Sequence, residues 1–572
     1  MKYSLLFLGV LFGMSIQVSA QFLPHQLTSE EARMEYQPPV ATGYTTPPAS
    51  EVRTPAEWEE IDGLCLRWEG TWSRSVLRNI VKYAKEEATV YIVTENQNSV
   101  VNHLNQYNID QNNIVFVDEP SNSIWFRDYG QWNVYTDDVD SLLWVDWIYN
   151  RPRPYDDVIP EALSQLLNIP LYQTTEVPYD LVNTGGNFMV DGFGTAFSSE
   201  LILEENDATN SFGTSNHSEA EIDAIMEDFM GIERYIKMPT LPYDGIHHID
   251  MHMKLLDEET LLIGEYPTGV ADGPQIESNM DYVLNNFNSV FGTEYKVIRV
   301  PMPPEGGQYP NQNGDYRTYT NSVFVNNTIL VPVYEEQWDT TALRIYREAL
   351  PGYKVVGIDC NEIITASGAI HCITKAVSSS DPLLISHQPL RDMVYSQNNY
   401  EVNAVIKHAE GISNASVFWT TDTTAGYTSV NMNLTNASED IWTGYIPYQA
   451  AGEKVFYYIH AEADNGKEQV RPMPAPAGYW KFKILEDVTG IKDMELRVSV
   501  HPNPSNGLFR ITLNEAKAMA YSVFDATGKL VDTGQKTSNS FQIDLRAQSN
   551  GLYLLRMEWE GRTRSFRLQK GF

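Results

Sequence analysis

The pattern of hydrophobic and polar positions changes along the chain and divides it into regions. Between residues 51 and 380, helical stretches at 74–87 and 218–230 alternate with short apolar strands at 90–94, 114–117, 261–263 and 322–325. This alternation predicts an α/β domain. Between residues 383 and 485, alternating strand-like segments lie at 400–407, 416–420, 442–447, 455–461 and 479–483, with turn residues between them. They predict an immunoglobulin-like β-sandwich without the cysteine pair of antibody domains.

The two ends of the chain follow other patterns. Residues 1–20 combine Lys2, an apolar stretch and the small residues Val18-Ser19-Ala20, which predicts a secretory signal peptide. Residues 21–50 contain two Pro-Pro pairs and little apolar periodicity, so we expect an extended leader or prosegment. Residues 488–572 predict a second small β-sandwich, with Pro, Asn and Gly turns. No later apolar stretch approaches the length of a membrane-spanning helix, so we expect none.

The net charge of the chain is −35, and it is spread unevenly. Residues 488–572 carry 12 Lys and Arg against 8 Asp and Glu, a net charge of +4, which leaves −39 on the rest. This acidic body argues against nucleic acid and anionic membranes as partners, because phosphate binding requires clustered Lys and Arg. Solubility accounts for such a charge, and an acidic protein also tolerates cationic substrates.

Three cysteines in a chain of this length cannot form a disulfide framework, and their odd number leaves at least one free thiol. Cys65 and Cys360 lie in apolar, strand-like segments. We expect both to be buried thiols, although the sequence leaves a disulfide between them open. Cys372 closes the run Gly368-Ala369-Ile370-His371-Cys372 and is the candidate nucleophile.

Carboxylates in the α/β region are suited to a guanidinium substrate. Such a group is planar and permanently cationic, so it requires carboxylates that accept its N–H groups. Asp128 is one candidate, with Trp125 near enough to stack on the cation, although a solvated Asp at a strand end is the common alternative. Asp250 is the second candidate. A strand here would point Asp250 and His248 in the same direction.

A zinc site is the alternative interpretation of the histidine-rich segment, because His247, His248, Asp250 and His252 lie close together in sequence. Zinc usually takes ligands from more than one segment, whereas the other segments here offer a thiol and an amide. We therefore favour a site without metal, in which His248 is the general acid and base. We expect no role in the reaction for His247 and His252.

Two further segments contribute candidate residues. Gly185, Gly186 and Asn187 would let the backbone approach a flat ligand closely, although an ordinary strand turn explains the run equally well. Asn321 stands just before an apolar strand, where it either orients the histidine or the thiol, or serves as a turn residue.

Taken together, Asp128, His248, Asp250, Asn321 and Cys372, with the Gly-Gly-Asn run, resemble the agmatine deiminase and bacterial (Porphyromonas-type) peptidylarginine deiminase family over residues 51–377. The resemblance implies a five-bladed α/β propeller of the pentein kind, which periodicity alone does not predict. It also implies that Asp128 and Asp250 bind guanidinium, that His248 is the acid and base, that Asn321 assists and that Cys372 is the nucleophile. No cofactor is required.

Residues 488–572 resemble the C-terminal sorting domain of the Gram-negative type IX secretion system. The motifs are Val498–Gly507, Val523–Lys529 and Gly551–Tyr553. This resemblance implies that secretion machinery exports the protein across the outer membrane, removes the tail and leaves the protein at the cell surface.

Arg151 and Arg153, in the sequence Asn-Arg-Pro-Arg-Pro, bear on the choice of substrate. In the Porphyromonas-type enzymes that the chain resembles, such a run holds the free carboxylate of a C-terminal arginine, so the resemblance implies arginine-containing peptides or proteins as substrates. Agmatine carries an amine there, which two arginines would repel. The alternative for the motif is a basic loop that offsets the acidic body. Gly245 and Ile246 depart from the family pattern, since we expect an aromatic residue to line such a pocket.

Two other functions stay open on the sequence. One is deimination of a small guanidine, such as agmatine or free arginine, in which Arg151 and Arg153 meet no carboxylate. The other is a surface adhesin, in which the α/β region only binds. The intact set of acidic, histidine and cysteine residues argues against the second.

Overall fold

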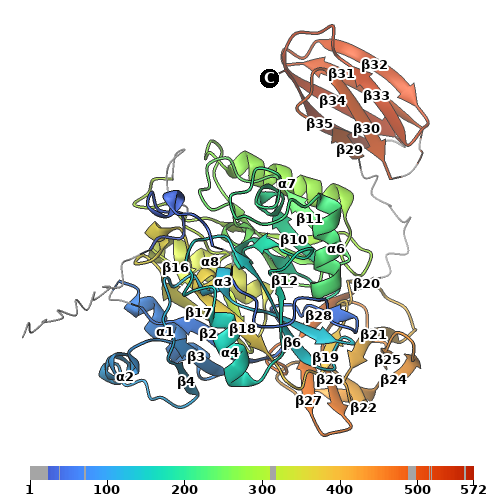
Figure 1. Cartoon of the computed structure of the whole chain (residues 1–572). Helices are drawn as coiled ribbons and strands as arrows, with labels where there is room; N and C mark the ends of the chain where they lie inside the picture. The colour runs from blue at the N-terminus through green and yellow to red at the C-terminus, as the bar shows by residue number, and fades with distance from the viewer. Residues whose placement is uncertain are drawn as a thin grey trace, which may run out of the picture. The chain divides into compact units, whose positions relative to one another are not determined.

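The computed structural model describes residues 23–37, 39–69, 72–309, 317–486, 498–514, 516, 518–559 and 562–571. The expected signal peptide, residues 1–20, lies outside the described residues. The chain forms two compact units, residues 1–485 and 486–572, each of which is described by itself (Figure 1). No helix among the described residues is long and apolar enough to cross a membrane.

The α/β region contains five small mixed sheets. Their strands are β1 (Val52–Arg53), β5 (Trp132–Thr136), β6 (Leu142–Tyr149), β7 (Leu171–Thr174) and β8 (Val182–Asn183); β9 (Met189–Val190), β10 (Thr195–Ser199) and β11 (Arg234–Met238); β12 (Met253–Asp257), β13 (Thr260–Glu265) and β14 (Lys296–Pro301); β15 (Val323–Val325), β16 (Thr328–Val333) and β17 (Lys354–Asp359); and β18 (Thr374–Ser378), β2 (Ile61–Arg67), β3 (Thr89–Val93) and β4 (Ile114–Val117).

Each sheet repeats one arrangement, in which an antiparallel pair is followed by a parallel strand reached through a helix. The connecting helices are α1 (Arg74–Ala84), α2 (Gln97–Gln106), α4 (Ile159–Leu167), α6 (Glu219–Met230), α7 (Gly273–Asn286) and α8 (Glu336–Ala349). Parallel strands need such crossovers, which explains the alternating pattern of the sequence. Strand β18, from the end of this region, pairs antiparallel with β2 from its beginning. The five-bladed propeller stays a prediction.

Local sequence signals account for the helix ends. Helix α6 begins with a capping box, in which the hydroxyl of Ser218 accepts from the backbone of Glu221 while the Glu221 carboxylate accepts from the backbone of Ser218. It ends at Gly231, which adopts the left-handed conformation with φ of 67°. The helix expected over 74–87 ends earlier, at Ala84.

The region after residue 382 is a β-sandwich. One sheet contains β19 (Leu384–Ser386), β21 (Tyr400–Lys407), β25 (Ile441–Ile446) and β24 (Asn433–Asn436), and the other contains β20 (Met393–Val394), β28 (Trp480–Leu485), β26 (Lys454–Ala463), β22 (Ile412–Thr420), β23 (Thr428–Asn431) and β27 (Glu468–Arg471). Val402 and Ile446 of the first sheet share a core with Tyr457 and Phe482 of the second. The five strands expected here are present, which confirms the alternating pattern.

The second unit also packs two sheets, which contain β29 (Val498–His501), β30 (Leu508–Leu513) and β33 (Ser540–Asp544), and β32 (Leu530–Lys536), β31 (Met519–Asp525), β34 (Gly551–Trp559) and β35 (Arg562–Lys570). Phe509, Ile543, Val523 and Leu555 form the core between them.

In the first unit, Cys65, Cys360 and Cys372 are all buried and free, so the expectation of an unbridged Cys65 and Cys360 is confirmed.

Asn326, in the turn between β15 and β16, connects two of the sheets. It has a φ of 48°, its Nδ2 donates to the carbonyls of Ile61 (3.0 Å) and Glu87 (2.9 Å), and its Oδ1 accepts from the Ile61 N–H (2.9 Å). Asn326→Gly keeps the left-handed turn but leaves buried backbone groups without partners, so we expect the free energy of unfolding to fall by about 2 kcal/mol in urea titrations.

Asn108→Gly is the matched control for this change. Asn108 is an exposed residue with a φ of 57°, so its replacement should alter the free energy of unfolding by less than about 0.5 kcal/mol. Equal effects of the two substitutions would show that the Asn326 side chain does not hold the sheets together.

Candidate active site

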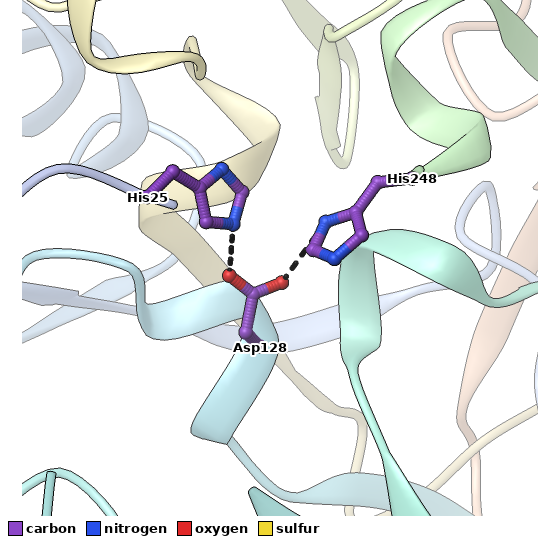
Figure 2. A group of neighbouring side chains, drawn as sticks. All are labelled: His25, Asp128 and His248. Carbon is purple, nitrogen blue, oxygen red and sulfur yellow. Dashed lines mark hydrogen bonds and ion pairs between the residues drawn. The ribbon is translucent and has the colours of Figure 1, made fainter. Parts of the chain in front are cut away.

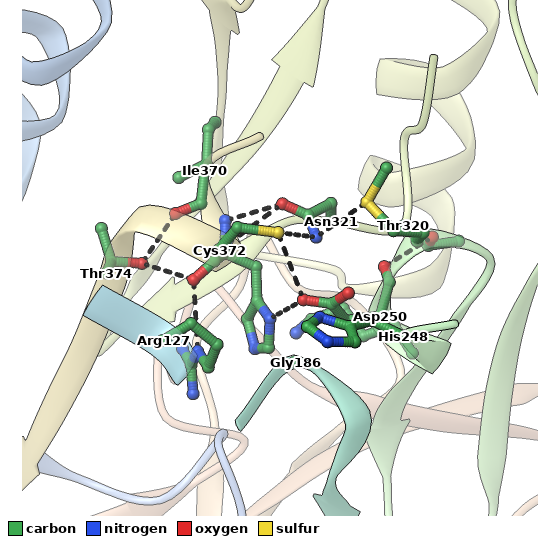
Figure 3. Close-up of polar contacts among 12 residues, drawn as sticks. Arg127, Gly186, His248, Asp250, Thr320, Asn321, Ile370, Cys372 and Thr374 are labelled. Atoms are coloured by element: carbon green, nitrogen blue, oxygen red, sulfur yellow. Dashed lines mark hydrogen bonds and ion pairs between the residues drawn. The ribbon is translucent and has the colours of Figure 1, made fainter. Parts of the chain in front are cut away.

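The five expected catalytic side chains come together at short turns beside the sheets. Asp128 lies in α3 (Phe126–Tyr129), Asp250 in η3 (Ile249–Met251) and Cys372 in η5 (His371–Ile373). His248 directly precedes η3, and Asn321 lies just before β15. His248 and Asp250 therefore do not alternate on a strand as expected, since they belong to a 3-10 turn. All five side chains are buried. Figure 3 shows His248, Asp250, Asn321 and Cys372 side by side.

Asn321 fixes both the thiol and the turn that carries it. Its Nδ2 donates to the Sγ of Cys372 at 3.1 Å, and its Oδ1 accepts from the backbone N–H groups of His371 (3.0 Å) and Cys372 (3.3 Å). The thiol in turn donates to Asp250 Oδ2 at 3.6 Å (Figure 3). Asn321 therefore orients the thiol, which was one of the two interpretations of this residue.

Protonation of the thiol and the imidazole follows from burial. Burial, and then the charges of Asp250 and Asp128, raise the pKa of the Cys372 thiol well above its usual value. Burial also lowers the pKa of His248 to about 3, against the opposite pull of Asp128. In this state of the site, Cys372 is a thiol and His248 is neutral.

The two carboxylates are held by different partners. Asp128 Oδ1 accepts from the hydroxyl of Thr184 (2.9 Å) and the N–H of Gly186 (3.1 Å). Asp250 Oδ2 accepts from His371 Nδ1 at 2.7 Å. Among the described residues, neither Asp250 Oδ1 nor His248 Nδ1 has a hydrogen-bond partner, although both are buried. Such unpaired atoms are costly in a core and are suited to accept N–H groups of a ligand.

Of the Gly-Gly-Asn run, Gly186 lies at the centre of the site. A Cβ atom on Gly186 would lie 2.5 Å from His248 Nδ1 and 3.2 Å from Asp250 Oδ2, so a side chain here would fill the space between them. Gly185 packs against the backbone of Arg127. Asn187 turns its amide away from the site and pairs it with the backbone of Ser199 (2.8 Å).

His25, in the leader, is a member of the site that sequence reasoning missed. Its ring stacks on Trp125, with centroids 4.4 Å apart and 7° between the planes. Its Nε2 pairs with Asp128 Oδ2 (Figure 2), and its Nδ1 lies 2.9 Å from the carbonyl of Ser367. Both partners are acceptors, so both ring nitrogens are placed to donate, which is the arrangement that an imidazolium cation would satisfy.

Arg151 and Arg153 contact the same leader. Arg151 Nε donates to the carbonyl of His25 (3.1 Å), and Arg153 Nη2 donates to that of Pro24 (2.8 Å). Arg153 Nε also pairs with the Glu31 carboxylate at 2.7 Å. The side chains of Arg153 and Glu31 are 1% and 7% exposed, so this ion pair is buried. The expected clamp therefore holds main-chain carbonyls and one carboxylate.

A second network of side chains, which the sequence analysis also missed, contacts Asp250 through His371. His371 places its Nδ1 on Asp250 and its Nε2 on Glu57 at 2.5 Å. Glu57 also accepts from Lys254 Nζ (2.6 Å) and lies 3.2 Å from Arg127 Nη1. Burial would raise the pKa of Glu57, but His371, Lys254 and Arg127 hold it well below its usual value. The network fixes one Asp250 oxygen and leaves the other free.

The zinc site considered from the sequence consisted of His247, His248, Asp250 and His252. Among the described residues, these four side chains are not a group that could hold a metal ion. His252 is buried, and burial lowers its pKa to about 4. The described group that could hold a metal ion is His25, Asp128 and His248, whose ligand atoms lie within 4.8 Å of one another. In this group Nε2 of His25 is engaged with Asp128 as a proton donor, whereas a metal would need its lone pair. A reaction without metal stays our prediction.

Comparison with known families gives two matches. Residues 53–377, more than half of the chain, match the model of the Porphyromonas-type peptidyl-arginine deiminases. Residues 499–569 match the model of the secretion system C-terminal sorting domain.

The individual relatives have low sequence identity to this chain. A provisionally named agmatine deiminase from Mycoplasma capricolum is 25% identical over 372 residues, covering 58% of this chain and 97% of the relative. One from Legionella pneumophila is 27% identical over 343 residues, covering 56% and 94%. The crystal structure of a provisionally named arginine deiminase from Porphyromonas gingivalis aligns with a TM-score of 0.50 at 19% identity, covering 58% of this chain and 99% of that one, which supports a shared fold.

Replacing Glu57 tests the network behind Asp250. Glu57→Gln takes the carboxylate charge away from Lys254 and Arg127 and from the Nε2 side of His371, so we expect the free energy of unfolding to fall by about 3 kcal/mol in urea titrations. The matched control is Glu86→Gln, which removes the surface pair with Lys354 and should cost less than about 1 kcal/mol. Similar losses in both variants would contradict a structural role for the network.

Proposed function

Because this chain belongs to the Porphyromonas-type peptidyl-arginine deiminase family, we propose that it converts the C-terminal arginine of peptides and proteins to citrulline and releases ammonia. Membership of the family makes the chain a hydrolase of amidine C–N bonds. Its sorting domain makes it a secreted or cell-surface protein of a Bacteroidetes-type bacterium. The choice of substrate is the proposal.

The observation that carries the choice is the chemistry of the arginine pair. Arg151 and Arg153 lie beside the site of Asp128 and hold carbonyl oxygens and the Glu31 carboxylate. Guanidinium groups in this geometry bind a carboxylate, as at the end of a peptide. Agmatine would bring an ammonium group to the same place, where two cations oppose it.

We assign the reaction steps as follows. The guanidinium of the substrate binds between Asp128 and Asp250 and stacks on Trp125. The Cys372 thiolate attacks its central carbon, and one C–N bond breaks as His248 gives a proton to the departing ammonia. A water molecule, deprotonated by His248, then attacks the same carbon. The C–S bond breaks, which yields the ureido product and restores the thiolate.

The substrate itself supplies the charge that ionises the thiol. In the site without substrate the pKa of Cys372 is raised by burial and by two carboxylates, so little thiolate exists at neutral pH. A bound guanidinium neutralises those carboxylates and favours the thiolate. Neutral His248 is then able to take up a proton.

We also propose the finer organisation that the family implies. The five mixed sheets support an arrangement as five blades, with the catalytic domain at 51–380, the immunoglobulin-like sandwich at 383–485 and the sorting domain at 488–572. We place the mature protein at the outer cell surface after removal of its tail. A function as a non-catalytic adhesin is less consistent with the site. An adhesin would not require Asp250 Oδ1 and His248 Nδ1 to be buried without hydrogen-bond partners.

The pH dependence of turnover tests the ionisation of the thiol. Because burial and the charges of Asp250 and Asp128 raise the pKa of the Cys372 thiol, we expect kcat/KM for a peptide ending in arginine to rise about tenfold per unit between pH 7 and pH 9. In the complex the substrate lowers that pKa, so kcat should level off at a lower pH. A kcat/KM that is flat over this range would show that the thiolate exists before substrate binds.

Substrate choice is tested with three compounds: a peptide ending in arginine, the same peptide amidated, and agmatine. We expect citrulline and ammonia release from the first, and none from the Cys372→Ala variant. Arg151→Met should raise KM for the free-carboxylate peptide about 10-fold to 100-fold, as for loss of a charged hydrogen bond, without raising KM for agmatine. Preference for agmatine would replace the proposal with a small-guanidine deiminase.

A further inference from the structure

We propose that residues 23–36, here called the plug, are a built-in inhibitor that occupies the substrate site and keeps the enzyme latent until they leave it. The inference rests on the proposed function, because it concerns access to that same site. It is carried by the contacts of two plug residues, His25 and Glu31, and by the burial that those contacts impose.

His25 takes the place expected for the guanidinium of the substrate. Its ring is planar and stacks on Trp125. The ring pairs with Asp128 and lies edge-on to His248, with ring centroids 4.8 Å apart (Figure 2). Burial would raise the pKa of Asp128, but its pairing with His25 and the hydrogen bond from Thr184 hold it well below its usual range. The cation of the plug therefore satisfies the carboxylate that the substrate would satisfy.

His25 cannot react as a substrate does. Deimination requires that one nitrogen leave the central carbon as ammonia. In imidazole both nitrogens that flank the Cε1 carbon belong to the ring, so breaking one bond releases no ammonia. The side chain of the plug binds as a cation and is inert to the chemistry.

Glu31 takes the place expected for the carboxylate of the substrate. It forms the buried ion pair with Arg153, and Arg153 lowers its pKa against the opposing effect of burial. Glu31 is held in position by Thr28, whose N–H donates to its carboxylate at 2.8 Å. The plug thus presents a cation to Asp128 and an anion to the arginine pair, as a C-terminal arginine would.

Main-chain contacts hold the plug along the site. Trp125 Nε1 donates to the carbonyl of Leu23 (3.0 Å), and the N–H of His25 donates to the carbonyl of Ala366 (3.0 Å). Gln26 lies so close to Gly245 that a Cβ there would be 2.2 Å from its Nε2. The plug therefore lies beside Gly245, where an aromatic side chain was expected, although Gly245 itself stays exposed.

The plug closes the site to solvent. With it in place, Cys372 is 0% exposed, His248 and Asp128 are 1% exposed and Asp250 is 3% exposed. Arg153 is 1% exposed and has no route to a carboxylate from outside. A peptide cannot reach either the thiol or the arginine pair until the plug moves, so turnover requires its release.

The chain beyond the plug offers a place for that release. Residues 39–50 connect it to β1, and within them Val40 is 85% exposed and Tyr44 is 59% exposed. While the connection is intact, the plug rebinds as an intramolecular ligand at high effective concentration. A cut in this connection leaves the plug held by noncovalent contacts alone, which include the hydrogen bonds of the Tyr44 backbone with Leu171 and Gln173, so that substrate can displace it.

The first experiment compares full-length variants by two readouts. The variants are His25→Ala, Glu31→Gln, and the control Glu30→Gln, whose carboxylate is exposed. The readouts are citrulline release from a peptide ending in arginine, and the alkylation rate of Cys372 by iodoacetamide, followed by mass spectrometry. Buried Cys65 and Cys360 are internal controls for unfolding.

We expect His25→Ala and Glu31→Gln to raise both rates about 10-fold to 100-fold, the gain expected when a site occupied about 90 to 99% of the time is freed. Glu30→Gln should match the parent protein. If alkylation rises but no variant turns over any substrate, the inhibitor is supported and the proposed function is not. Unchanged alkylation and turnover in both plug variants would overturn the inhibitor. Alkylation of Cys65 or Cys360 would identify unfolding. In that case we would insert a specific endoprotease site after Thr46 in the full-length chain and cut the folded protein there. The same two readouts on the cut protein then decide the question.

A second experiment adds the plug back to the cut protein. A synthetic peptide of residues 23–37, with Arg33→Lys so that it cannot be a substrate, should raise KM without changing kcat. For the same peptide with His25→Ala, equal inhibition should require a peptide concentration at least about tenfold higher. Equal inhibition by both peptides would show that His25 does not occupy the guanidinium site. Repeating the assay with added EDTA and with added zinc tests the metal alternative, since inhibition that depends on zinc would overturn the direct ion pair of His25 and Asp128.

Discussion

Two carboxylates buried beside a thiol set the conditions for the rest of this site. Asp128 and Asp250 are 1% and 3% exposed, and an ionised group at that depth is stable only next to positive charge and hydrogen-bond donors. The fold supplies part of this at fixed positions, through Thr184 and Gly186 for Asp128 and through His371 for Asp250. The remainder must come from a cation that enters the site. Substrate binding and the proposed inhibition therefore depend on the same property of the site, which is that its buried carboxylates are stabilised by a cation.

This demand also explains why the reactive groups are unreactive at rest. The carboxylates that attract a guanidinium oppose the formation of a thiolate, and burial adds to that effect. Asn321 orients the thiol but carries no charge, so it cannot offset two anions. The nucleophile becomes effective when a cation lies between it and the carboxylates. Selectivity for cationic substrates is thereby built into the activation of the enzyme as well as into its binding.

The sequence was sufficient for much of the fold and for the group of side chains that the fold brings together. Strands and crossover helices followed from periodicity. The motifs selected Asp128, His248, Asp250, Asn321 and Cys372, and their roles in the reaction stay predictions. The strand expected at His248 and Asp250 was wrong, because the turn there is fixed by contacts with distant segments that no local pattern encodes. His25 and Glu57 were missed for the same reason. His25 lies 103 residues from its partner Asp128, and Glu57 lies 314 residues from His371.

The leader looked featureless because its order comes from the site and not from its own pattern. Apart from a 3-10 turn at Glu31–Arg33, the residues from 23 to 37 contain no helix or strand. Their contacts are with groups that exist to bind something else: Trp125, Asp128, Arg151 and Arg153. A segment held in this way needs little of the hydrophobic periodicity that sequence analysis detects, since charge pairing and main-chain hydrogen bonds fix it. The two proposals together predict that Arg153 has opposing effects on activity, because the side chain proposed to bind the substrate carboxylate also holds Glu31 of the plug.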